Sequence, residues 1–162
     1  MDILTHPNPA LRVKATDVDP KADTELESLV KTMAQAMYDA PGIGIAAPQV
    51  GVLKRVIAFD LDEGLIALCN PVIVSASEET DIEEEGCLSL PGITVPIARS
   101  VSVVCEALNL KGEPVRIEAT ELAARMLQHE TDHLDGLLII DRATPDERKA
   151  AIRRYNEAQN TE

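Results

Sequence analysis

Gln128-His129-Glu130-Thr131-Asp132-His133 is the most informative stretch of this 162-residue chain. On a helix, His129 and His133 lie four residues apart on one face, so they can present two imidazoles to a single metal ion. Glu130 follows the first histidine and is close enough to take a proton from a water molecule that the ion activates. The pattern therefore indicates a metallohydrolase. An ordinary polar helix face is the alternative, because two imidazoles do not complete a metal site.

Length and composition indicate one globular domain over residues 1–162. Hydrophobic residues make up 45% of the chain, yet no stretch approaches the ~20 apolar residues that cross a bilayer. The segment Met1–Pro7 has neither the basic nor the apolar region of an export signal. Cys69, Cys87 and Cys105 form no CxxC pair, and Cys69 and Cys105 read as small buried hydrophobes. We expect a cytoplasmic protein that does not enter a membrane.

The charge and the aromatic content argue against nucleic-acid binding. The formal net charge is −13, whereas a protein that grips a phosphate backbone needs a basic footprint. Tyr38, Phe59 and Tyr155 are the whole aromatic content, which is too little for a base-stacking platform. The acidic run over residues 78–85 reads as a solvated face, and Glu85 is its one member that could be buried and paired.

Capping signals and helical periodicity predict three helices. Thr24 and Glu27 form a capping box before a run of apolar residues at helical spacing. Gly136 is a natural C′ residue for the helix that carries HExxH. Thr144 followed by proline and acidic residues opens the last helix. The predicted helices are residues 24–39, 120–136 and about 145–158.

Short runs rich in Val and Ile predict strands between these helices. Asp62-Glu63-Gly64 and Lys111-Gly112 look like hairpin turns, which favours antiparallel pairing. The predicted fold class is α+β, with antiparallel strands around a central HExxH-bearing helix, an N-terminal helix and a C-terminal helix. The predicted strands are Val52–Phe59, Ala67–Val74, Val101–Leu108, Pro114–Ala119 and a short one at Leu137–Ile140.

Two kinds of residue are candidates for the third metal ligand. Downstream of the histidines lie the carboxylates of Asp141, Glu147 and Glu157, each with an ordinary explanation as a capping or surface charge. Upstream, Glu85-Gly86-Cys87-Leu88-Ser89 places a thiol in a bend between two strand-like runs, where the backbone can aim it inward. From the residues alone, both solutions stay open.

A third block is Gly42-Ile43-Gly44-Ile45-Ala46-Ala47-Pro48-Gln49. Its glycines permit a close approach of the backbone, but no nucleotide-binding loop is matched, and a simple connection with Gln49 on the surface would also explain it. Together, GxGxAAPQ, EGCLS and QHExDH resemble the three signature motifs of the peptide deformylases, in order and separation. The resemblance extends to the entry segment at residues 3–12 and to the hairpin at residues 108–114.

The resemblance implies a set of metal ligands. Cys87, His129 and His133 would hold one divalent metal ion, with water in the fourth position and Glu130 as the base that accepts its proton. Fe²⁺ is the usual ion in the family, and Zn²⁺, Ni²⁺ or Co²⁺ can occupy the site. The ligand set by itself would suit zinc at least as well.

The resemblance also implies a reaction, the removal of the formyl group from N-formylmethionyl peptides with release of formate. The side-chain amide of Gln49 and the backbone N–H of Leu88 would donate hydrogen bonds to the oxyanion that forms. Glu130 would then pass its proton to the leaving amine.

Several residues are predicted to bind the substrate. Leu122 and Met126 precede His129 on its face of the helix and could form an apolar pocket with Ile43, although core packing would explain them equally well. Arg125 could add its aliphatic stem. Asp132 could orient a ligand imidazole, or pair on the helix surface. The backbone of Gly42, Ile43 and Gly44 would receive an extended peptide, and Arg99 matches a family arginine that a salt bridge could also explain.

The expected partners follow from the same resemblance. The chain would act as a monomer on formylmethionyl peptides, and the basic residues of the last helix suggest contact with the ribosome near its exit tunnel. Three other functions stay open, namely a related metallohydrolase on another N-acyl substrate, a zinc peptidase with a downstream carboxylate ligand, and a catalytically silent deformylase-like binding domain.

Overall fold

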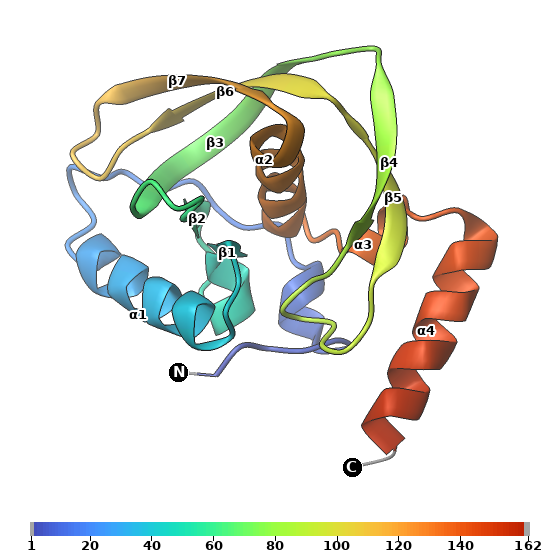
Figure 1. The fold of residues 1–162 in the computed structure, drawn as a ribbon. Helices are drawn as coiled ribbons and strands as arrows, with labels where there is room; N and C mark the ends of the chain where they lie inside the picture. The colour runs from blue at the N-terminus through green and yellow to red at the C-terminus, as the bar shows by residue number, and fades with distance from the viewer. Residues whose placement is uncertain (1, 161–162) are drawn as a thin grey trace.

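The computed structural model describes residues 2–160. Within them the chain forms four α-helices, two short 3-10 helices and seven strands (Figure 1). The helices are η1 Pro9–Arg12, α1 Leu26–Asp39, η2 Ala47–Val50, α2 Glu121–Leu134, α3 Ile139–Arg142 and α4 Pro145–Asn160. The strands are β1 Gly44–Ala46, β2 Val56–Phe59, β3 Ile66–Ala76, β4 Thr80–Glu85, β5 Val95–Ser100, β6 Ser102–Leu108 and β7 Pro114–Thr120.

The strands form two antiparallel sheets. One sheet has five strands in the order β1-β2-β3-β6-β7, and β4 and β5 pair separately. The hairpin turns predicted at residues 62–64 and 111–112 are confirmed, since they join β2 to β3 and β6 to β7. The mixed helix and antiparallel sheet fold is therefore as predicted. The described residues include no helix that is long and apolar enough to span a membrane.

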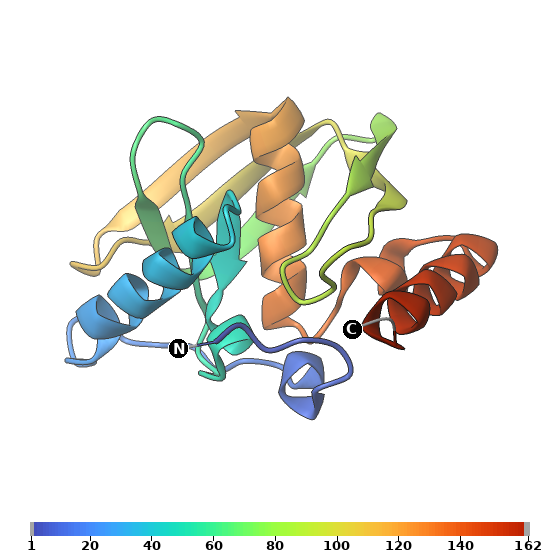
Figure 2. The same ribbon diagram turned by 60° about the horizontal axis from the view of Figure 1, so that its bottom comes forward.

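Helix α2 packs against strands of both sheets. It lies between the five-stranded sheet and the β4–β5 pair in both views (Figures 1 and 2). Ala124, Leu127 and Leu134 are buried on it and join the core cluster that also holds Ile57 and Leu68 of the large sheet. This apolar face fixes the rotation of the helix, and the rotation decides where its polar residues point.

Three strands were not predicted. β4 is acidic and exposed along most of its length, so it lacks the alternation of apolar and polar residues that marks a half-buried strand. β5 contains Pro96, and β1 has three residues and begins with a glycine. The acidic run was predicted over residues 78–85, and residues 78–84 are exposed as predicted. Glu85 is buried and paired, which is the exception that the sequence analysis allowed.

Two predictions about the helices are wrong. Thr24 does not cap α1, which begins after a turn in which the Asp23 side chain accepts a hydrogen bond from the Glu25 N–H. Residues 137–140 do not form a strand, because α3 begins at Ile139 and the Asp141 carboxylate accepts a hydrogen bond from the Leu138 N–H. A short apolar run does not distinguish a strand from a buried helical turn.

The remaining helix boundaries agree with the sequence. α1 ends at Asp39, and α2 ends before Gly136, which has a φ of 78°. The Thr144 hydroxyl accepts a hydrogen bond from the Glu147 N–H at 3.3 Å, so α4 begins at Pro145.

Replacing Gly136 with alanine should destabilise the fold by about 2 kcal/mol or more. Gly136 has a left-handed backbone conformation, which residues with a side chain rarely adopt. A Cβ atom there would also lie 2.6 Å from the backbone oxygen of Arg12. Gly64→Ala is the matched control, because Gly64 also has a positive φ but has open space around it. The free energies of unfolding, measured with urea, should show the larger loss for Gly136→Ala. Equal losses would contradict this account.

Candidate active site

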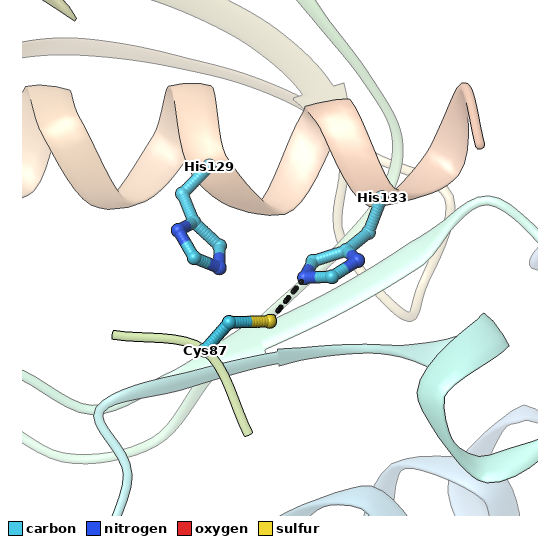
Figure 3. Close-up of side chains that lie close together, drawn as sticks. All are labelled: Cys87, His129 and His133. Atoms are coloured by element: carbon cyan, nitrogen blue, oxygen red, sulfur yellow. Dashed lines mark hydrogen bonds between the residues drawn. The ribbon is translucent and has the colours of Figure 1, made fainter. Parts of the chain in front are cut away.

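Cys87, His129 and His133 come together beneath α2 (Figure 3). One ligand atom from each lies within 4.8 Å of the other two. The Cys87 Sγ is 3.4 Å from the His133 Nε2, and the two imidazole centroids are 5.1 Å apart. Cys87 precedes a tight turn, closed by a hydrogen bond from the Leu90 N–H to its carbonyl oxygen, and this loop carries the thiol to the helix.

The donor set fits a divalent transition metal. One sulfur and two nitrogens, with room for one further ligand, are typical of a catalytic site rather than of a closed structural one. His129 already uses Nδ1 in a contact of 2.9 Å with a Glu85 carboxylate oxygen, so its Nε2 is the nitrogen left for a metal. Burial, and the charge of His129 nearby, hold the pKa of His133 well below its usual range, which keeps a lone pair available on that ring.

Glu85 connects the cluster to two arginines. Its carboxylate accepts two hydrogen bonds from Arg99, both at 3.0 Å, and one from Arg125 at 2.5 Å. Burial by itself would raise the pKa of Glu85, but the hydrogen bonds from His129 and Arg99 lower it to about 2. The carboxylate is therefore ionised at neutral pH and fixes the orientation of the His129 ring.

Glu130 is buried beside the cluster with one carboxylate oxygen unpaired. The residue is 4% exposed, and its Oε1 has no hydrogen-bond partner among the described residues. Burial raises its pKa to about 7. A carboxyl group that gains and loses a proton near neutral pH is suited to general acid–base chemistry. Gly44 permits this placement, because a Cβ there would lie 2.7 Å from the Glu130 Oε2.

Gln49 also lies beside the cluster. It is 1% exposed, so the alternative that placed it on the surface is wrong. Its Oε1 accepts a hydrogen bond from the Ala46 N–H at 2.9 Å, and its Nε2 is 4.0 Å from the Cys87 Sγ. The backbone N–H of Leu88, the next residue after the cysteine, has no acceptor within the described part of the chain. Two N–H donors of this kind are what an oxyanion needs.

A pocket of about 580 Å³ opens over the cluster. Five residues that were predicted to bind the substrate line this pocket, namely Gly42, Ile43, Gly44, Leu122 and Met126. The lining also includes Cys87, His129, Glu130, Gln49 and Leu88. Met126 is buried, whereas Ile43 and Leu122 are exposed at the rim. β1, at one side of the pocket, is an edge strand of the five-stranded sheet, and within residues 2–160 no other strand pairs with its outer edge.

Two predicted residues lie elsewhere. Arg99 does not line this pocket but is buried between Glu85 and Asp132. The structure therefore supports the alternative interpretation of Arg99 as a salt-bridge residue. Asp132 does not orient an imidazole, because it pairs with Arg99 and Arg142. The acceptor on the His129 ring is Glu85, and the His133 Nδ1 has no partner among residues 2–160.

Sequence reasoning missed two contributors. Arg125 was expected to offer its aliphatic stem, but its guanidinium joins Glu85 of β4 to α2 and also pairs with Asp81. Ser89 was not singled out at all, although its buried hydroxyl accepts a hydrogen bond from the Gln49 Nε2 at 3.1 Å. Both contacts join segments about 40 residues apart, so no local pattern signals them.

A HExxH helix that packs against antiparallel strands, with a cysteine thiol beside its two histidines, is typical of metal-dependent hydrolases. The family model of polypeptide deformylase matches residues 1–149. The chain therefore belongs to the polypeptide deformylase family, and the family prediction made from the three motifs is confirmed.

Individual relatives agree with this assignment. The chain is 47% identical to the peptide deformylase of Acidothermus cellulolyticus, over 94% of this chain and 83% of the relative. It is 50% identical to that of Clostridium botulinum, over 83% and 90% of the two chains. The crystal structure of the Legionella pneumophila peptide deformylase superposes with a TM-score of 0.91 at 38% identity, covering 98% of this chain and 95% of the other.

Replacing Glu85 with glutamine should cost about 3–5 kcal/mol of stability, since Arg99 and Arg125 each lose the more deeply buried of their two carboxylate partners. The folded-state pKa of about 2 lies below the ordinary value of 4.5, so the carboxylate stabilises the fold above pH 4.5. The difference between wild type and variant should shrink as the pH falls from 4.5 toward 2.

Urea unfolding at several pH values measures this difference. Glu83→Gln is the control, because Glu83 is an exposed residue of the same strand. A loss that does not depend on pH would contradict the assigned role of the ionised carboxylate.

Proposed function

We propose that the Cys87, His129 and His133 cluster and the pocket above it form the active site of a metal-dependent peptide deformylase. As a member of the family, the chain is a hydrolase that removes the formyl group from N-formylmethionyl peptides. The observation that carries the proposal is the cluster itself, with three ligand atoms within 4.8 Å of one another beside the unpaired oxygen of the buried Glu130. We further propose that residues 1–162 form one catalytic domain, with the HExxH helix at its centre.

Cys87, His129 and His133 would hold one divalent ion. Such an ion would act as a Lewis acid on the formyl oxygen and lower the pKa of a water molecule. Glu130 takes the proton of the attacking water and later gives it to the leaving amine. Its pKa of about 7 suits both steps, because either protonation state is accessible at neutral pH.

Gln49 and Leu88 stabilise the charge that develops on the formyl oxygen. The Gln49 amide approaches the cluster from η2 and the Leu88 backbone N–H from the loop after Cys87, and both residues line the pocket. Donors that are already in place need no reorganisation at the moment of reaction. Their value is greatest in a site that excludes water, as the burial of Gln49 implies.

The pocket accepts the methionine side chain and the start of the peptide. Met126, Leu88 and Ile43 supply an apolar lining that suits a thioether side chain. The free edge of β1 offers backbone groups of Gly44 to an extended peptide, which would add to the sheet as a further strand. A substrate bound in this way carries its formyl group toward Glu130, which contacts Gly44.

The finer assignments rest on the family resemblance. We propose Fe²⁺ as the resident ion, with Zn²⁺, Ni²⁺ and Co²⁺ as substitutes. A cytoplasmic monomer, with α4 near the ribosomal exit tunnel, is the proposed setting.

The other candidate functions fit the structure less well. A zinc peptidase would need a downstream carboxylate, but Asp141 pairs with Arg12 and Arg148 and is not part of the cluster. A silent binding domain would have no need for a buried, unpaired Glu130 beside a buried Gln49. A related N-acyl hydrolase differs only in its substrate, which the following assay decides.

Protein loaded anaerobically with Fe²⁺, or with Ni²⁺, should release formate from formyl-Met-Ala-Ser and lose this activity with a chelator. Cys87→Ala should lose both bound metal and turnover, whereas Cys105→Ala should keep both, because Cys105 is a buried thiol outside the cluster. Formate release and the metal content per chain are the measurements. No turnover with one metal bound per chain would direct the search to another N-acyl substrate.

Replacing Glu130 with glutamine should lower kcat by about 10² to 10⁴-fold, because the amide accepts no proton. The metal content should not change, since Glu130 is not a member of the ligand cluster. Glu121→Gln is the control, as Glu121 lies in the exposed first turn of the same helix. Full activity of Glu130→Gln would disprove the proposed acid–base role.

A further inference from the structure

The Gln49 side chain can place an N–H over the active site only if its amide group cannot rotate. Its carbonyl oxygen is fixed by the hydrogen bond from the Ala46 N–H at 2.9 Å. One N–H of its amide nitrogen goes to the Ser89 hydroxyl, 3.1 Å away. An amide nitrogen has two N–H groups, so the second is free to point at the cluster, where the Cys87 Sγ lies 4.0 Å away.

Ser89 has no contact with the pocket. It is fully buried and is absent from the pocket lining, so it touches neither water nor a bound peptide. Among the described residues, its hydroxyl makes a hydrogen bond to one side chain, that of Gln49. The hydrogen bond to the Gln49 amide is therefore the contact through which the Ser89 hydroxyl can affect the reaction.

The N-terminal segment holds both η2, which carries Gln49, and the loop that carries Ser89. The Leu4 N–H donates to the Gln49 carbonyl oxygen at 2.7 Å, and the His6 N–H donates to the Ser89 carbonyl oxygen at 2.8 Å. One short segment thus binds both backbones and sets the distance between them. The segment runs along the lower side of the molecule in Figure 2. Its other side is tied to α4, because the Tyr155 hydroxyl donates to the His6 carbonyl oxygen at 2.8 Å.

We propose that Ser89 is a positioning residue for the reaction, which holds the Gln49 amide so that its second N–H faces the formyl oxygen. The N-terminal segment, residues 4–6, keeps Ser89 and Gln49 at the required distance. The inference rests on the deformylase function proposed above. Without the Ser89 hydroxyl, the amide loses one of its two anchors and can turn its free N–H away from the site.

The kinetic test compares Ser89→Ala with Ser100→Ala, each in wild type and in Gln49→Ala. Ser100 is the matched control, because its hydroxyl also makes one hydrogen bond, to the Ser77 carbonyl oxygen at 2.9 Å, but lies outside the active-site pocket. We expect Ser89→Ala to lower kcat by about 10 to 100-fold with KM within about twofold, because the donor acts on charge that develops in the transition state. When Ser89→Ala is added to Gln49→Ala, kcat should fall by less than about a further twofold.

Two measurements separate positioning from a structural defect. The visible spectrum of the Co²⁺-loaded protein reports on the Cys87 ligand and should not change in Ser89→Ala. In the Zn²⁺-loaded protein, the side-chain NH₂ resonances of Gln49, assigned by their loss in Gln49→Ala, should shift in Ser89→Ala and stay in place in Ser100→Ala. This second measurement does not need activity, so it tests Ser89 even if the wild type releases no formate.

The outcomes are distinct. An equal loss of kcat with and without Gln49, a rise in KM alone, a changed Co²⁺ spectrum or unchanged Gln49 resonances would each overturn the positioning role. If Ser89→Ala does not fold, Ser89→Cys, which keeps the shape of the side chain but has a weak acceptor, takes its place in the same measurements.

Discussion

The buried carboxylate of Glu85 is the group on which the site depends. It is the last residue of β4 and lies two residues before Cys87, so it joins the thiol-bearing loop to the helix. It meets His129, Arg99 and Arg125 at once, which connects β4, β5 and α2 through one charge. A buried charge is tolerated only when it is paired and hydrogen-bonded. The same contacts that make burial possible therefore also fix the His129 ring for a metal.

The pairing continues away from the pocket. Arg99 also contacts Asp132, and Asp132 contacts Arg142, so a chain of alternating charges crosses the helix from the cluster to the surface. This explains why Asp132 and Arg99 do not serve the substrate or an imidazole directly. Asp132 neutralises Arg99, and Arg99 in turn pairs with Glu85 and helps to keep its carboxylate ionised.

How far the sequence predicted this structure depends on the range of the interactions. The turn at residues 62–64, the end of α1 at Asp39 and the cap at Thr144 follow from neighbouring residues, and all three agree with the structure. β4 was missed because its residues are acidic, and its pairing with β5 is not encoded in its own pattern. Residues 137–140 were wrongly assigned to a strand because tertiary contacts decide short apolar runs. At the site, motif spacing predicted which residues meet. The partner of the His129 ring lies on β4 and the anchor of Gln49 lies in the loop after Cys87, and each is distant in sequence from the residue it contacts.

The contrast between satisfied and unsatisfied polar groups marks where the chemistry belongs. Four buried charged side chains make hydrogen bonds to another charged group or to the backbone, namely Glu85, Arg99, Arg125 and Asp132. Within residues 2–160, the buried side-chain atoms without a partner are the Glu130 Oε1 and the His133 Nδ1, and both residues belong to the HExxH motif. A fold that pairs its other buried groups has the means to pair these two as well. Since an unpaired buried group destabilises a protein, the unpaired Glu130 oxygen next to three potential ligands is best explained by a need that arises during the reaction.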